Sequence, residues 1–220
     1  MLFRSVIQGY LGRAADLRYD AGVVDTFLHR QDRAYAVADC LALARDAGMK
    51  FMGWWDNILY YPDGQLRRNR DLYDRVNALP EESIWRFMEL YNGTLGQHGF
   101  CVCRAERPER SYKIQFETSA FMDYVPIRRC REVAVKRGAP EGCVTVQRGA
   151  YPAYTLDPVT SRLFRQIDGR KSVRQCFEQA GLAGPNGPAP EPTCKAAFQY
   201  LWRLSHIFLR ISSGPPSPAG

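Results

Sequence analysis

The sequence feature that most constrains the fold is a series of helix-start signals in the last third of the chain. Asp157 precedes Pro158, and this pair suits a helix start because Asp can accept a free N–H while proline has none to satisfy. Ser172 is followed three residues later by Gln175, which makes a capping box. Thr193 opens a third amphipathic segment. The sequence therefore predicts three short helices that begin at these positions.

Two alternating apolar segments flank the three predicted helices. Residues 143–147 precede the helices and residues 207–211 follow them, and both have the composition of short strands. A strand, three helices and a strand predict a small α+β domain of the winged-helix type over residues 143–212. Residues 213–220 contain mainly Ser, Pro and Gly, and we expect them to form a disordered tail.

The charge of the 220-residue chain is confined to its second half. Residues 1–110 hold 15 Lys and Arg and 15 Asp and Glu, whereas residues 111–220 hold 15 basic and 8 acidic residues and so carry the whole net charge of +7. Such a shift in composition predicts two units with different surroundings. We expect a first domain over residues 1–110, a connector over 111–142 and then the winged-helix-like domain.

Composition excludes several classes of protein. Seven cysteines are an odd number and too few for a disulfide scaffold of this length. No apolar run reaches 18 residues, and the first 20 residues lack the apolar core of a signal peptide. We expect a cytoplasmic protein with no membrane partner.

The first half predicts part of an α/β domain. Helical periodicity and strand-like apolar runs alternate in the order helix, strand, two helices, strand, at residues 36–47, 49–55, 71–78, 81–95 and 98–104. This order suits the closing edge of an α/β sheet, with the second strand beside the first. Two strands alone make a marginal sheet, so the rest of a larger sheet would have to come from elsewhere.

The string D-x-F-L-H-x-x-D-R-x-Y at residues 25–35, and the glycine-containing strand at 93–104, resemble the late part of class I S-adenosylmethionine-dependent methyltransferases. The resemblance implies the closing part of a Rossmann-like sheet and S-adenosylmethionine as the cofactor of the parent protein. Such enzymes bind the cofactor at a glycine-rich turn after the first strand, and this sequence contains no such turn. We therefore assign no cofactor-binding residue and expect a truncated chain that is inactive alone.

A second resemblance concerns the predicted winged-helix-like domain. The pattern of residues 154–173, with Asp168-Gly169 as its best-matched point, resembles the small domains of peptide-binding chaperones in the coenzyme PQQ pathway. It implies that this domain contacts a protein partner.

The densest polar cluster in the first half supplies candidate catalytic residues. If the methyl acceptor is a hydroxyl or amine, His29 could remove its proton while Asp25 or Asp32 orients the imidazole. Arg33 and Tyr35 could hold an acidic group of a small-molecule or peptide acceptor. In the alternative interpretation, Asp32 and Arg33 pair around the start of the following helix and His29 is structural.

Aromatic residues after the first strand are candidates for a substrate pocket. Trp54, Trp55 and Tyr60 could line such a pocket, and the alternative is that they belong to the core. We predict no metal site, because Cys101-x-Cys103 has no second cysteine pair or paired histidines nearby.

The competing functional class is a non-enzymatic binding module for an acidic partner or nucleic acid. The third predicted helix is too apolar to read a DNA groove from the solvent. A better basic patch lies on the first two helices of the domain and comprises Arg162, Arg165, Arg170, Lys171 and Arg174. We expect this patch to be a solvated face, and nucleic acid is the less favoured partner.

Overall fold

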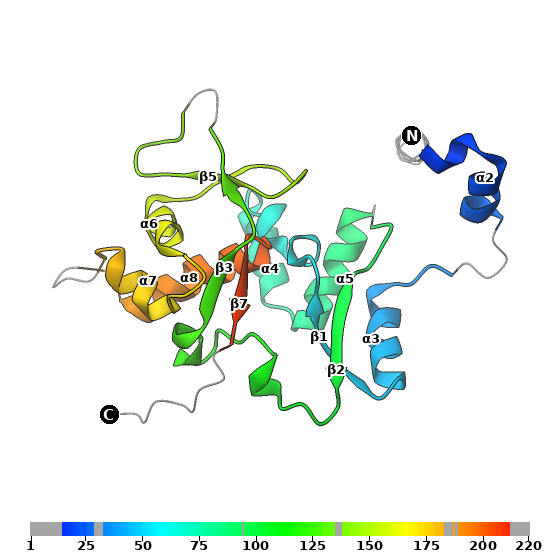
Figure 1. The fold of residues 1–220 in the computed structure, drawn as a ribbon, viewed down its shortest axis with the longest axis horizontal. Helices are drawn as coiled ribbons and strands as arrows, with labels where there is room; N and C mark the ends of the chain where they lie inside the picture. The colour runs from blue at the N-terminus through cyan, green and yellow to red at the C-terminus, as the bar shows by residue number, and fades with distance from the viewer. Residues whose placement is uncertain are drawn as a thin grey trace.

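The computed structural model describes residues 15–28, 33–93, 95–134, 138–182, 187 and 189–211. The first described segment comprises the 3-10 helix η1 (Ala15–Arg18) and the helix α2 (Asp20–Phe27). Figure 1 shows α2 set apart from the rest of the fold. The predicted tail at 213–220 lies outside the described residues.

The first half contains the elements that the sequence predicts. They are the helix α3 (Val37–Asp46), the strand β1 (Met49–Trp54), the helices α4 (Arg70–Asn77) and α5 (Glu81–Asn92), and the strand β2 (Phe100–Arg104). Gly48 ends α3 with a φ of +67°, a left-handed conformation that glycine adopts without steric cost. β1 and β2 pair antiparallel, with an irregularity in register between Phe51 and Gly53.

Between β1 and α4 the chain forms two 3-10 helices, η2 (Asn57–Leu59) and η3 (Pro62–Gly64). Tyr60 and Tyr61 lie between them and are 1% exposed. They belong to a cluster of buried residues that also includes Trp54, Trp85 and Met88. This aromatic cluster is the core of the first half.

The second half begins with the 3-10 helices η4 (Glu109–Ser111) and η5 (Ser119–Asp123) and then contains short strands and three helices. Its elements are β3 (Val125–Arg128), β4 (Arg131–Glu132), β5 (Thr145–Gln147), β6 (Tyr154–Thr155), α6 (Pro158–Gln166), α7 (Val173–Gln179), α8 (Pro190–Arg203) and β7 (Ile207–Arg210).

The helix-start signals act as the sequence predicts at α6 and α7. Asp157 accepts the Thr160 N–H at 2.9 Å, and Ser172 and Gln175 each accept the other's backbone N–H, at 3.2 and 2.9 Å. The prediction for the third helix is wrong by one turn, because α8 begins at Pro190 and not at Thr193. Proline suits this first position because its missing N–H would have no helical partner there.

The two strands that the sequence predicts on either side of the helices, β5 and β7, do not pair with each other in the described structure. β7 pairs with β3, whereas β5 pairs with β4 and β6. All of these pairs are antiparallel, like β1 with β2. Within the described residues the fold is therefore mixed α/β with small antiparallel sheets, and the expected Rossmann-like sheet is represented only by the β1–β2 pair.

The segment 111–142, predicted to be a connector, supplies structure to the second half. Phe116, Phe121, Met122 and Tyr124 are buried in the same cluster as the helices α6, α7 and α8. These side chains are apolar and close in sequence to β3, so pairing of β3 with β7 draws them under the helices. The domain boundaries themselves stay a prediction.

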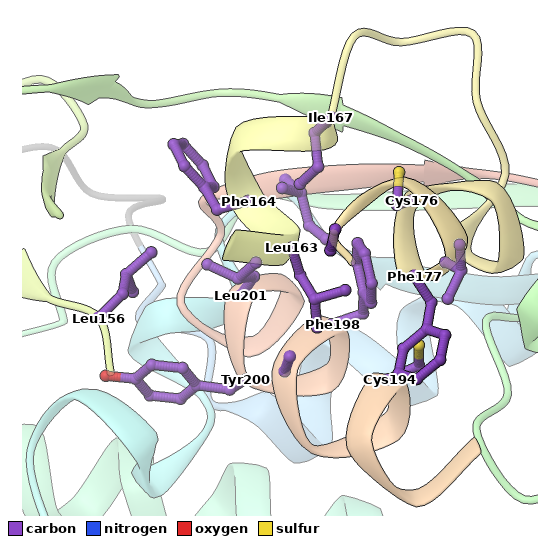
Figure 2. Close-up of a cluster of buried hydrophobic side chains, with 14 of the residues drawn as sticks. Leu156, Leu163, Phe164, Ile167, Cys176, Phe177, Cys194, Phe198, Tyr200 and Leu201 are labelled. Carbon is purple, nitrogen blue, oxygen red and sulfur yellow. The ribbon is translucent and has the colours of Figure 1, made fainter. Parts of the chain in front are cut away.

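Figure 2 shows how α6, α7 and α8 build this second core. Leu163, Phe164, Cys176, Phe198 and Leu201 have no exposed surface and come from all three helices. Burial of an aliphatic or aromatic side chain of this size stabilises a fold by about 1.5–3 kcal/mol, so these contacts hold the helices together.

The two halves meet along α8 and the turn that follows it. Asn57 donates to the Trp202 carbonyl at 3.2 Å, and the Ile58 N–H donates to the Ser205 hydroxyl at 3.2 Å. Arg203 donates to Asn77 at 2.7 Å and lies 3.4 Å from Asp63, whose side chain is 4% exposed. The turn after α8 therefore fixes η2 and η3 against the second half.

His206 is completely buried beside this junction. Its ring lies edge-on to that of Tyr154, with 5.5 Å between centroids, and neither ring nitrogen has a hydrogen-bond partner among the described residues. Burial, and then the charge of Arg148, lower the pKa of His206 to about 4. The folded protein therefore holds this imidazole neutral.

This buried imidazole predicts a loss of stability in mild acid. The unfolded chain binds a proton at His206 below its ordinary pKa of 6.5, but the folded chain does so only near pH 4. The free energy of unfolding is thus highest above pH 6.5, as far as this group is concerned, and falls by about 3 kcal/mol as the pH approaches 4. Urea unfolding of the protein and of His206→Leu, measured from pH 7.5 to 4.5, should show the smaller pH dependence in the variant. Equal pH dependence, or an imidazole that titrates near 6.5 by NMR in the folded protein, would contradict it.

Candidate functional site

Three side chains from separate segments form a contiguous polar triad in the first half. The Tyr60 hydroxyl lies 2.8 Å from Nδ1 of His98, and Nε2 of His98 lies 3.1 Å from Glu89. Tyr60 follows η2, His98 precedes β2 and Glu89 is on α5. We call these residues the Tyr60–His98–Glu89 triad.

The start of α3 holds the acidic end of the triad. The Val37 N–H lies 3.0 and 3.1 Å from the two carboxylate oxygens of Glu89. Val37 is the first residue of α3, and free N–H groups and the helix dipole at such an end favour a negative charge. The side chain of Glu89 is therefore positioned by the start of α3, with one of its oxygens 3.1 Å from Nε2 of His98.

The tautomer of His98 sets the direction of its hydrogen bond with Tyr60. With the proton on Nε2, which faces Glu89, Nδ1 accepts the hydrogen bond from the Tyr60 hydroxyl. Burial raises the pKa of Tyr60 well above 10, and the nearby Cys40 and Glu89 add to this effect, so the phenol keeps its proton. The His98 side chain is only 7% exposed, which protects the triad from competing water.

Two cavities border the triad. One, of about 440 Å³, is lined by His98, Cys40 and Phe100, with Arg33 and Tyr35 also in its wall; we call it the His98 cavity. Another, of about 280 Å³, is lined by Tyr60, Gln97, Asp56, Trp55 and Tyr151. The triad therefore joins two cavities through one hydrogen-bonded path.

A thiol also faces the His98 cavity. Cys40 lies on the buried side of α3, and burial raises its pKa, with smaller contributions from Glu89 and Asp39. The thiol is thus a neutral apolar wall of the cavity, because only the thiolate is a strong nucleophile.

Of the candidate catalytic residues, Asp25 alone can be placed. It is exposed on α2, while His29 and Asp32 lie outside the described residues. The structure therefore shows no contact between Asp25 and a base, and the roles of these three residues stay predictions.

The candidate substrate residues Arg33 and Tyr35 lie together. The Arg33 guanidinium is 5.2 Å from the centre of the Tyr35 ring and 3.4 Å from Asp39 of α3. Both residues are exposed and line the His98 cavity. In the structural alternative, Arg33 pairs with Asp32 around the start of the helix. The structure pairs Arg33 with Asp39 of α3, and Asp32 lies outside the described residues.

Trp54, Trp55 and Tyr60 have different surroundings. Trp54 stacks on Tyr60 with 3.9 Å between ring centroids, and both are buried in the core, as the alternative interpretation expects. Trp55 is 57% exposed and packs edge-on against Phe208 of β7. Only Tyr60 of the three combines a core position with a hydrogen bond to a titratable group.

The sequence does not identify His98 and Glu89 as partners. The described residues contain no group of three metal-ligating side chains that would draw attention to His98. One signal could have revealed Glu89: it follows Trp85 by four residues and so lies on the apolar face of α5. An acidic residue on a buried face requires a partner, and its partners are the start of α3 and His98.

The described residues do not fit S-adenosylmethionine in the manner of class I methyltransferases. β1 leads into η2, and its end is filled by the stacked rings of Trp54 and Tyr60, without a glycine-rich turn into a helix. No parallel strand pair is present among the described residues, so the sheet edge at which these enzymes bind the cofactor is not formed by them.

None of the described helices is long and apolar enough to cross a bilayer.

Comparison with solved structures gives a partial structural resemblance. No family model matches the sequence. The structure of PKMT2 from Rickettsia typhi shares 8% identity with a TM-score of 0.47, over 89% of this chain and 40% of that chain. The structure of the same protein in complex with AdoHcy gives 9%, 0.49, 87% and 39%.

This chain therefore spans about two fifths of the length of that protein. Neither structure supports the likeness of residues 154–173 to peptide chaperones of the PQQ pathway, which stays a prediction.

The triad predicts a specific role for the charge of Glu89. Glu89→Gln should destabilise the protein by about 1.5–3 kcal/mol, because it replaces charge-assisted hydrogen bonds to His98 and Val37 with neutral ones. It should also release His98 from a single tautomer, which long-range ¹H–¹⁵N NMR spectra of the imidazole detect. The control is Glu82→Gln, an exposed change on the same helix that should alter stability by less than about 0.5 kcal/mol. Equal effects of the two variants would show that the triad has no energetic role.

Proposed function

We propose that this chain is the acceptor-side part of an S-adenosylmethionine-dependent methyltransferase. The observation that carries the proposal is the Tyr60–His98–Glu89 triad at the wall of the His98 cavity. The methyltransferase-like string at residues 25–35 also supports it, since the end of that string, at Arg33 and Tyr35, lines the same cavity.

Methyl transfer to a hydroxyl or amine requires an aligned acceptor, exclusion of water and a place for the acceptor's proton. His98 is suited to receive that proton, because it lines the cavity and its Nε2 lies 3.1 Å from the Glu89 carboxylate. Tyr60 can pass the proton to Nδ1 through its hydroxyl. Arg33 and Tyr35 would orient an acidic or polar part of the acceptor at the mouth of the cavity.

The cofactor would be bound elsewhere in the parent protein, because the described residues form no cradle for it. When bound there, S-adenosylmethionine would supply the methyl group. His29, Asp25 and Asp32 are proposed to lie on the same side of the acceptor, and the acceptor is proposed to be a small molecule or a peptide. The second half would then act as an accessory domain that contacts a protein partner.

We also propose a reducing compartment, the cytoplasm. All seven cysteines are free, and four of them are buried: Cys40, Cys103, Cys176 and Cys194. Burial raises the pKa of Cys194 to about 12, so its thiol is unreactive in the folded state.

The structure gives the nucleic-acid alternative no specific support. Several cations of the predicted basic patch are used within the fold: Arg162 donates to the Gly181 carbonyl at 2.8 Å, Lys171 pairs with Asp168 and Arg174 pairs with Asp123. Phosphate contacts would have to compete with these interactions.

The proposal predicts how the chain responds to cofactor and acceptor. Isothermal titration of the 220-residue chain with S-adenosylmethionine should give no saturable binding, because no described segment forms the required turn. Small primary amines and alcohols added to ¹⁵N-labelled protein should shift the His98 and Tyr60 resonances, and Tyr60→Phe should weaken the response.

Two outcomes would contradict the proposal. Saturable binding of S-adenosylmethionine would mean that the chain holds its own cofactor site. Absence of any response at His98 across the panel of amines and alcohols would remove its role as acceptor-side base.

A further inference from the structure

A third cavity, of about 170 Å³, has aromatic and acidic walls and is not part of the triad. It lies among β1, α5, the residues after η4 and the end of α8, and we call it the aromatic cavity. Its aromatic lining residues are Phe51, Trp54, Tyr61, Trp85, Tyr112 and Trp202.

We propose that the aromatic cavity binds the methylated ammonium group of a small organic cation. The face of an aromatic ring carries negative charge density that attracts a cation, and enclosure by several rings is the arrangement that suits quaternary ammonium groups. Some of the rings are perpendicular to one another: the Trp85 ring is at 87° to those of both Trp54 and Tyr61, with centroid distances of 5.6 and 6.5 Å. Perpendicular rings enclose a small ligand from several sides, which a stack of parallel rings cannot do.

Carboxylates outnumber cations among the residues that line the cavity. The carboxylates of Glu81, Glu82 and Glu109 line it, against one ammonium group, that of Lys113. Glu81 accepts the Tyr61 hydroxyl at 2.6 Å, whereas Glu82 and Glu109 have no ion-pair partner within the described part of the chain. Two carboxylates thus remain available to balance a bound positive charge.

One ring of the cavity already contacts a cation. The Arg203 guanidinium carbon lies 4.8 Å from the centre of the Tyr61 ring, and Arg203 is itself held by Asp63 and Asn77. The cationic surroundings therefore comprise Arg203 on Tyr61, Arg107 at 5.8 Å from Tyr112, and Lys113. Neither arginine is among the residues that line the cavity.

The mainly aromatic wall selects a methylated cation over a free ammonium group. A free ammonium donates three hydrogen bonds and is strongly hydrated, so it loses more on entering a wall of rings. A quaternary ammonium group has no N–H to satisfy. The volume is well below that of cavities that enclose whole drug-sized ligands, so it suits a single head group.

Choline provides a direct test on the 220-residue protein, with tryptophan fluorescence and calorimetry as readouts. The first control is 3,3-dimethyl-1-butanol, which has the shape of choline without its charge, and the second is ethanolamine, which has the charge without the methyl groups. Choline should bind about five- to thirtyfold more tightly than either, as cation–π attraction of about 1–2 kcal/mol implies.

Variants locate the site. The double change Glu82→Gln with Glu109→Gln alters only exposed residues, so it should leave the fold intact and weaken choline binding several-fold. Glu178→Gln, an exposed acidic residue on α7, is the matched control and should leave choline binding unchanged.

The proposal is overturned if choline does not bind, if either control ligand binds as tightly, or if the double variant binds choline like the parent. Its failure is separate from that of the proposed function, because choline binding needs neither the triad nor S-adenosylmethionine.

Discussion

The first half depends on the contacts of the Glu89 carboxylate. This carboxylate connects α5 to the first N–H of α3 and to His98, and His98 in turn connects to Tyr60. A half-buried carboxylate without such partners would be costly, so the three segments are held at the positions that satisfy it. The His98 cavity is lined by residues of α3 and of the segment that leads into β2, which these contacts join.

The second half depends more on apolar packing than on charge. Side chains of α6, α7 and α8 with no exposed surface form one cluster, and Phe116, Phe121, Met122 and Tyr124 join it from the segment before β3. The turn after α8 then contacts η2 and η3 of the first half. The positive charge of this half is partly consumed within the fold: Arg129 and Arg148 both pair with Asp56 of the first half. Part of the excess positive charge of the second half is therefore paired with a carboxylate of the first half, and these ion pairs connect the two halves.

Local signals in the sequence predicted local structure well. The caps at Asp157 and Ser172, and the glycine that ends α3, act within four residues along the chain, and all are found in the structure. The start of α8 was missed because Pro190 is as good a first residue as the position after Thr193, and the helix begins there although Pro190, Glu191 and Pro192 are exposed. Strand partners were not predictable in this way, since β7 pairs with β3, about 80 residues earlier.

The sequence by itself determined where α6 and α7 begin, which helix faces are apolar, and that the positive charge belongs to the second half. Only the tertiary structure decided which side chains form a site. His98 and Glu89 are nine residues apart, but Tyr60 and Val37 are distant from both, and no local pattern specifies that their polar atoms meet. The aromatic cavity likewise joins residues from Phe51 to Trp202. The physical reason is that capping and periodicity are properties of a few neighbouring residues, whereas a cavity and its charges arise from packing of elements far apart in the chain.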